Sequence, residues 1–216
     1  MPEPDRRSLP PLERGPDLSR ILAFTDGVFA IAITLLVLQI EVPDPLRGNG
    51  DFVDALGDML PDLFAFGISF AVIGVYWISH HRLMRMVREF DRGLMGLTLF
   101  YLAWIVLLPF SSQLIGEYGS DVPLTATFYI LNLALVAISQ SLMVRLILKH
   151  GLAEPEWEWN LRLTLKSSNY TAAVFILTAP LGLALGGWTP LLWFPLLYLD
   201  PWQRRATLQS GNGCSG

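Results

Sequence analysis

The chain has 216 residues, of which 52% are hydrophobic and only 16% are charged, with a formal net charge of −4 at pH 7. Soluble domains carry about 25% charged residues, so this composition excludes an ordinary water-soluble domain and favours an integral membrane protein. The small negative charge gives no indication of nucleic-acid binding, and no nucleic-acid partner is expected.

Uncharged stretches predict the membrane-spanning helices in chain order, because about 20 apolar residues cross the hydrocarbon core as a helix. The stretches are residues 21–40, with one charged residue, and residues 63–79, 93–116, 122–144 and 167–199, with none. The last is too long for one crossing, and Gly186, Gly187 and Pro190 divide it. The predicted spans are therefore residues 20–40, 62–82, 93–116, 122–147, 166–186 and 188–203.

These spans predict one all-α, six-helix transmembrane domain over residues 1–205, followed by a disordered tail over residues 206–216. The tail contains the single cysteine, Cys214, so no intrachain disulfide is possible. The first 20 residues are polar and rich in proline, which predicts no cleavable signal peptide. The first helix is then its own insertion signal.

Basic residues predict the orientation, because Lys and Arg in short loops stay on the cytoplasmic side. Of the fifteen, only Arg47 falls on the opposite side of the predicted spans. The others are Arg6, Arg7, Arg14, Arg20, Arg82, Arg85, Arg88, Arg92, Arg145, Lys149, Arg162, Lys166, Arg204 and Arg205. Both termini are therefore expected in the cytoplasm, with the protein in the inner or plasma membrane.

One acidic residue, Asp26, interrupts the first span. An ionisable side chain inside a membrane span is costly and indicates either a functional group or a polar tether between helices. Arg20 lies six residues earlier and so on another face of the helix, which excludes a close intrahelical pair. Trp77, His80, His81 and Arg82 lie at about the same depth in the second span, and we expect Asp26 to find its partner there, with an imidazole as the hydrogen-bonding group.

A stripe of residues follows Asp26 along the first span. Ile31, Thr34, Leu35 and Leu38 recur at helical spacing and so share one face. From spacing alone, such a stripe is more typical of a core or lipid-facing surface than of a pore.

Motifs for catalysis and metal binding are missing from the sequence. His80, His81 and His150 are too few and too separated for a closed metal site. No glycine-rich phosphate loop, nucleophile with an adjacent base, or TVGYG potassium filter is present. We therefore expect no enzymatic activity, no cofactor and no bound metal.

The string RILAFTD at residues 20–26, continued by AIAIT and LLVL, resembles the RxxxFSD signature of the transmembrane protein 175 family of potassium channels. Thr25 replaces the usual serine and keeps the hydroxyl. The resemblance extends to Trp77, His80 and His81 at the end of the second span, and six helices in this length are similar to prokaryotic members with a single repeat.

The resemblance implies a homotetramer in which the first helices line a central pore. Ile31, Leu35 and Leu38 would form the pore constriction, with Thr34 beside them as a hydroxyl layer. It also implies a passive, potassium-permeable cation channel with a hydrophobic gate, whose partners are potassium ions, the lipid bilayer and three further copies.

The resemblance implies a structural role for a polar network at the cytoplasmic end of the first helix. Its members would be Arg20, Thr25, Asp26, Trp77, His80 and His81. The alternative is a proton-coupled membrane carrier in which Asp26 and a histidine relay protons, since intramembrane carboxylates and imidazoles serve that purpose. No internal repeat is visible, which favours the channel.

Overall fold

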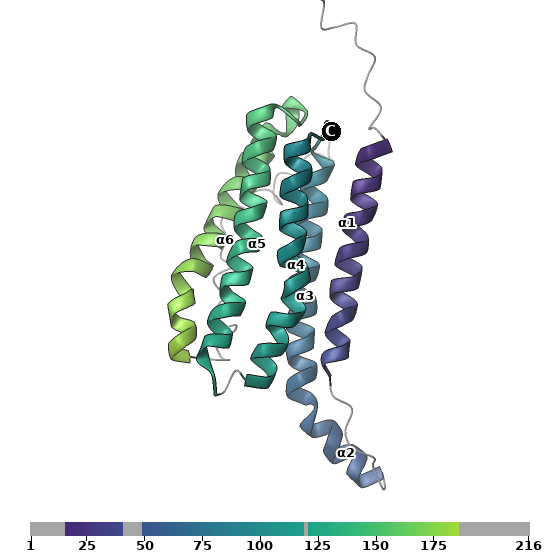
Figure 1. Cartoon of the computed structure of the whole chain (residues 1–216), viewed down its shortest axis with the longest axis vertical. Helices are drawn as coiled ribbons and strands as arrows, with labels where there is room; N and C mark the ends of the chain where they lie inside the picture. Colours follow the sequence, from purple (N-terminus) through teal and green to yellow (C-terminus); the bar gives the residue numbers. More distant parts are fainter. Residues whose placement is uncertain (1–15, 41–48, 119–120, 186–216) are drawn as a thin grey trace, which may run out of the picture.

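The computed structural model describes residues 16–40, 49–118 and 121–185, and all of its regular elements are helices (Figure 1). They are α1 (Pro16–Leu35), η2 (Leu36–Gln39), α2 (Asn49–Asp58), α3 (Leu60–Arg85), α4 (Arg92–Tyr118), α5 (Pro123–His150), η3 (Pro155–Trp157) and α6 (Glu158–Leu185). The predicted all-α class is confirmed. The predicted sixth span at 188–203, the tail with Cys214, and Arg47 lie outside the described residues.

Four of the described helical segments are long and apolar enough to cross a membrane. They are Ser19–Gln39, Val53–Arg85, Arg92–Tyr118 and Pro123–His150. A further long helix, α6, contains most of the predicted span at 166–186 but begins earlier, at Glu158. This pattern describes a multi-pass membrane protein.

Two local features differ from the predicted layout. The first span does not remain α-helical to residue 40, because the α-helix ends at Leu35 and continues as the 3₁₀ helix η2. A short helix, α2, occupies residues predicted as a loop between the first two spans. It lies obliquely at the end of the bundle and leads directly into α3 (Figure 1).

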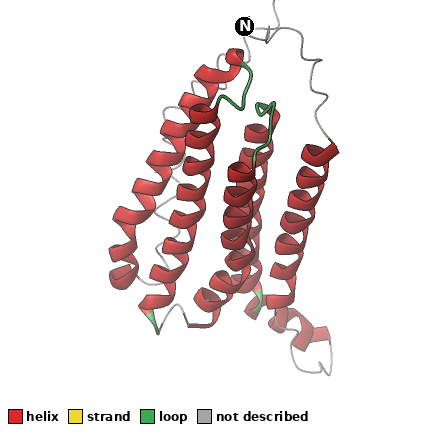
Figure 2. Ribbon diagram, turned by 45° about the horizontal axis from the view of Figure 1, so that its top comes forward, coloured by secondary structure: helices red, strands yellow, loops and turns green. Residues whose placement is uncertain are grey.

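The long helices stand side by side, with α1 at one edge and α6 at the other (Figures 1 and 2). Helix α1 packs on α3 and α4, while α5 packs on α4 and α6. The core between them contains large, fully buried side chains such as Phe29, Ile73, Tyr101 and Leu133. One side of α1 is therefore covered by its own chain, whereas no helix among residues 49–118 and 121–185 packs against its other side.

The two connections at one end of the bundle are joined to each other. Val87 and Ala153 form an isolated antiparallel bridge, and the amide of Arg88 donates to the carbonyl of Leu152 at 2.8 Å. Asp91 accepts a hydrogen bond from Nδ1 of His150 at 2.7 Å. This contact holds the α3–α4 connection against the α5–α6 connection, at the end predicted to be cytoplasmic.

Candidate functional site: the open face of the first helix

Helix α1 has one buried side and one open side. The buried side consists of Thr25, Phe29, Ala32 and Leu36, each at most 1% exposed. Their spacing of four, three and four residues keeps them on one face of a helix. Because these side chains fill the contact with α3 and α4, the helix cannot rotate without losing that packing.

The stripe predicted from the sequence lies on the open side. Ile31 is 59% exposed, Leu35 is 39% exposed and Leu38 is 77% exposed. An aliphatic face that its own chain leaves uncovered contacts either lipid or another copy in a membrane protein. The structure therefore brings the three predicted constriction residues to a common, outward-facing surface.

Thr34 belongs to the same open face, and its hydroxyl has a defined direction. The Oγ1 donates a hydrogen bond of 2.9 Å to the carbonyl of Ile31, one turn back on the same helix. A hydroxyl has one proton but two lone pairs. Since the proton is directed at the helix, the oxygen presents its lone pairs outward, which is the polarity that a cation requires.

The end of the first span is anchored by a side chain that the sequence analysis did not single out. Gln39 in η2 donates from Nε2 to the carbonyl of Pro109 in α4 at 2.6 Å. The only indication of this role in the sequence is the position of Gln39, an amide at the edge of an apolar span, where an unpaired polar group is costly. This bond fixes the last turn beside Leu38.

Asp26 has a partner at the expected depth on α3, but the donor is the indole of Trp77 and not an imidazole. Trp77 Nε1 donates a hydrogen bond of 2.8 Å to Oδ1 of Asp26. The ring of Trp77 lies 5.7 Å from that of His81, centroid to centroid. Asp26 is therefore tied to α3 through an indole, which has one donor and no proton to relay at ordinary pH.

His80 occupies a different environment from Asp26. Its imidazole is 2% exposed and stacks on Tyr101 with ring centroids 5.2 Å apart, with Phe29 at 6.1 Å. Within the described residues, neither His80 Nε2 nor the buried hydroxyl of Thr25 has a hydrogen-bond partner. The structure thus buries Thr25 of α1 and His80 of α3 in the packed interior.

Arg20 stands apart from these contacts. It is exposed, and no ion pair joins it to any part of the chain that the structure describes. The structure therefore brings Asp26, Trp77 and His81 together on one side and buries Thr25 and His80, while Arg20 faces outward. A metal-binding cluster of His, Cys, Asp or Glu is also absent from residues 16–40, 49–118 and 121–185.

A second polar cluster, inside the bundle, was missed by sequence reasoning. The hydroxyls of Ser69 and Ser112 lie 2.6 Å apart, and Asn132 donates from Nδ2 to Ser111 Oγ at 3.1 Å. These residues come from three different helices, α3, α4 and α5. Isolated small polar residues in apolar spans are common between packed membrane helices, so spacing alone could not identify this set.

The chain is similar in sequence to known ion channels. Residues 20–109 match the family model described as endosomal/lysosomal potassium channel TMEM175. A potassium channel of Streptomyces collinus is 35% identical over 181 residues, which cover 78% of this chain and 87% of that protein. The human endosomal/lysosomal proton channel TMEM175 is 41% identical over 101 residues, which cover 44% of this chain and 20% of that protein.

A solved structure extends the similarity to the fold. The crystal structure of a homolog of the lysosomal potassium-selective channel TMEM175, from Chamaesiphon minutus, superposes with a TM-score of 0.73. The sequences are 27% identical, and the match covers 86% of this chain and 97% of that one. The similarity in fold therefore extends beyond residues 20–109, which the family model matches.

Proposed function

Because the chain belongs to the TMEM175 family, we propose that it is a subunit of a potassium-permeable cation channel that conducts passively. Its relatives in the preceding comparisons are named as ion channels rather than enzymes, in agreement with the prediction that the chain is not an enzyme. The observation that carries the proposal is the open face of α1, where Ile31, Thr34, Leu35 and Leu38 lie together on a helix held firmly from behind.

In the proposed assembly, four copies place α1 around a central axis with this face inward. A single copy leaves aliphatic side chains of α1 uncovered while Phe29 and Leu36 are fully buried behind them. Closed rings of identical subunits are the ordinary way to cover such a face symmetrically. The pore is then made by α1, which lies at one edge of its own bundle (Figure 1).

The proposed constriction consists of rings of Ile31, Leu35 and Leu38. Aliphatic rings offer no oxygen to replace the water shell of an ion, so a narrow pore of this kind conducts hydrated ions or closes by dewetting. Potassium selectivity over sodium is then weaker than in a filter lined by carbonyl oxygens. Four Thr34 hydroxyls beside the constriction supply the nearest oxygen lone pairs.

The proposed role of the polar network is to hold α1 in position at its cytoplasmic end. Asp26 and Trp77 connect α1 to α3 by one hydrogen bond, and Thr25 and His80 are buried in the same region. Arg20 and His81 are exposed, so they are available to neighbouring copies or to lipid headgroups. Loss of this network is expected to damage assembly before it alters selectivity.

The proposed topology is six spans in the inner or plasma membrane with both termini in the cytoplasm. Its support is the distribution of basic residues: Arg82 and Arg85 end α3, and Lys149 and His150 end α5. Both helices thereby carry cations at the end where α3–α4 and α5–α6 connect, which is the end that the positive-inside rule assigns to the cytoplasm.

The alternative function is a proton-coupled carrier in which Asp26 and a histidine form a relay. The human relative is named a proton channel, which supports testing this chain for proton permeation. However, the hydrogen bond of Asp26 is made with Trp77, and no bond to His80 or His81 occurs within the described residues. A relay through these groups therefore has no direct contact to use.

The test uses the full chain in liposomes loaded with potassium chloride and diluted into sodium chloride, with a pH-sensitive dye. A potassium channel creates an inside-negative potential that drives proton uptake only after a protonophore is added. A proton-coupled carrier that exchanges outgoing potassium for incoming protons acidifies the liposomes without the protonophore. Absence of any protonophore-dependent signal, with valinomycin as the positive control, would contradict the potassium channel.

A further inference from the structure

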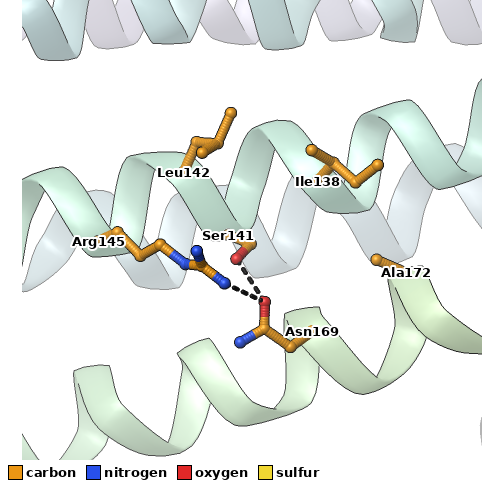
Figure 3. Close-up of a pocket in the computed structure, with 6 residues that line it drawn as sticks. All are labelled: Ile138, Ser141, Leu142, Arg145, Asn169 and Ala172. Atoms are coloured by element: carbon orange, nitrogen blue, oxygen red, sulfur yellow. Dashed lines mark hydrogen bonds between the residues drawn. The ribbon is translucent and has the colours of Figure 1, made fainter.

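The hairpin of α5 and α6 has a shallow hollow on its outer side, which we name the α5–α6 groove. Its volume is about 120 Å³, and Ile138, Ser141, Leu142, Arg145, Asn169 and Ala172 line it (Figure 3). The groove lies at the edge of the bundle opposite α1 (Figure 1). It is therefore separate from the proposed pore.

The polar end of the groove is built around one amide. Arg145 donates from Nη2 to Oδ1 of Asn169 at 3.1 Å, and Ser141 donates from Oγ to the same oxygen at 2.7 Å. Figure 3 shows Arg145 reaching from α5 across to Asn169 on α6. A guanidinium has five N–H groups, so this one bond orients Arg145 and leaves most of its donors for another acceptor.

Two further cations lie close to this end by helical spacing. Lys149 follows Arg145 by four residues on the exposed side of α5, and Lys166 precedes Asn169 by three residues on α6. Arg145, Lys149 and Lys166 are exposed and form no ion pair within the described chain. Among the described residues, no carboxylate lines the groove, so an anionic ligand complements its positive charge.

The other end of the groove is apolar. Ile138 and Leu142 continue along α5 toward the middle of the helix, and Ala172 and the half-exposed Ile176 do the same on α6. Arg145 is five residues from the end of α5 at His150, which is about 7 Å along the helix axis. Cations near the membrane surface followed by aliphatic side chains deeper in the membrane match a phospholipid in both polarity and direction.

We propose that the α5–α6 groove binds an anionic phospholipid of the cytoplasmic leaflet. Its phosphate accepts hydrogen bonds from Arg145 and Asn169 and is attracted by Lys149 and Lys166, while an acyl chain lies on Ile138 and Leu142. Guanidinium groups bind phosphate oxygens through paired N–H donors. The inference rests on the proposed orientation of the helices, which places this end of the hairpin at the cytoplasmic surface.

The test is native mass spectrometry of the full chain in detergent with an equimolar mixture of phosphatidylglycerol and phosphatidylcholine. The wild type is expected to retain phosphatidylglycerol in preference to phosphatidylcholine. Arg145→Gln and Lys149→Gln should each lower that preference about fivefold, the effect of one basic charge near a membrane surface. Arg88→Gln is the matched control, because Arg88 lies on the same side but already faces Glu89 and Glu154.

Arg145→Lys keeps the charge and should retain most of the preference, with size-exclusion elution verifying that each variant is folded. Equal retention of the two lipids by the wild type would overturn the proposal, as would an unchanged preference in both Arg145→Gln and Lys149→Gln. Displacement of the lipid by millimolar inorganic phosphate would also overturn it, because the site would then be one for a free anion. No ion gradient is applied, so the result is independent of conduction.

Discussion

Asp26 of α1 and Trp77 of α3 are 51 residues apart in sequence and are joined by a hydrogen bond of 2.8 Å from the indole nitrogen to the carboxylate. The bond crosses between the helix with the open face and the helix behind it. It therefore constrains the rotation and depth of α1, on which the direction of Ile31 and Leu35 depends.

We expect Trp77→Phe to lower the stability of the assembled protein by about 1 kcal/mol, because phenylalanine keeps one aromatic ring but removes the donor. Thermal unfolding and the oligomeric fraction in detergent measure this effect. In a double-mutant cycle with Asp26→Ala, the two losses should be less than additive. Trp104→Phe is the control, because Trp104 Nε1 has no hydrogen-bond partner within the described residues.

Asp26→Asn separates a structural role from a conducting one. Its amide oxygen still accepts the bond from Trp77, so we expect assembly and potassium flux close to those of the wild type. Oligomer yield and liposome flux are measured on the same preparation. Unchanged yield together with abolished flux would show that the charge of Asp26 acts in conduction or gating.

The open face of α1 is tested by introducing an amide at one position at a time. Ile31→Asn, Leu35→Asn and Leu38→Asn each replace a proposed aliphatic ring by polar groups that coordinate water and ions. We expect a several-fold higher conductance, or weaker discrimination between potassium and sodium, at the narrowest ring. Single-channel currents in a planar bilayer with the two cations on opposite sides measure both quantities.

The control for this series is Leu177→Asn in α6, since Leu177 is 76% exposed and Leu38 is 77% exposed. The two changes have the same chemistry and a similar starting exposure, but Leu177 is on the helix at the far edge of the bundle. If Leu177→Asn changed the currents and none of the three α1 variants did, the pore would not be lined by this face.

The Asp91–His150 contact predicts a stability that decreases in acid. The backbone N–H of Leu94, and then the bond from His150, hold the pKa of Asp91 below its ordinary value of 3.8. Above pH 3.8 the carboxylate is charged in both folded and unfolded chains, and its stabilisation is fully present. As the pH falls below 3.8, the unfolded chain takes up the proton first and the stabilisation is lost.

The measurement is the difference in unfolding temperature between the wild type and Asp91→Asn in detergent at several pH values. The difference should be larger at pH 5 than at pH 3, with the decrease occurring between pH 4 and pH 3. A difference that persisted unchanged at pH 3 would mean that the carboxylate is not stabilised by these partners. Glu156→Gln is a control, since this exposed carboxylate in η3 has no ion pair in the described part of the chain.

Gly182 marks a close approach of α6 to α5. A Cβ at this position would lie 2.8 Å from Thr127 Oγ1 and 3.0 Å from the backbone nitrogen of Thr127. Because that backbone cannot move within its helix, Gly182→Ala should destabilise the hairpin by about 1–3 kcal/mol. Gly74→Ala in α3 is the matched control, with no atom within 4 Å of the new Cβ and a gain in helix propensity.

Unfolding of the two alanine variants in mixed micelles compares them directly. The prediction requires Gly182→Ala to be less stable than the wild type and Gly74→Ala to be at least as stable. Equal stability of the two variants would show that α6 moves away from α5 at little cost.

The similarity to potassium channels and the helical membrane fold followed from the sequence, because hydropathy and a local motif depend on residues close together in the chain. The length of the uncharged stretches is determined by the thickness of the hydrocarbon core. The motif at residues 20–26 lies within one helix, and the pair His80 and His81 lies within another. Neither requires knowledge of which helices touch.

The direction of each face was decided only by tertiary packing. Spacing placed Ile31, Thr34, Leu35 and Leu38 on one stripe but left open whether that stripe is covered by its own chain. Phe29, Ala32 and Leu36 are buried instead because α3 and α4 pack against them. The change to a 3₁₀ helix after Leu35 and the bond from Gln39 to Pro109 belong to the same contact.

The partner of Asp26 shows the same division between local pattern and long-range contact. Helical periodicity excluded Arg20 and proposed Trp77, His80 and His81 at equal depth. Only the rotation of α3 against α1 directs Trp77 toward the carboxylate and buries His80 against Tyr101. The sequence by itself therefore identified the apolar segments long enough to cross a membrane, whereas tertiary structure decided which side chains meet, because that depends on contacts between distant parts of the chain.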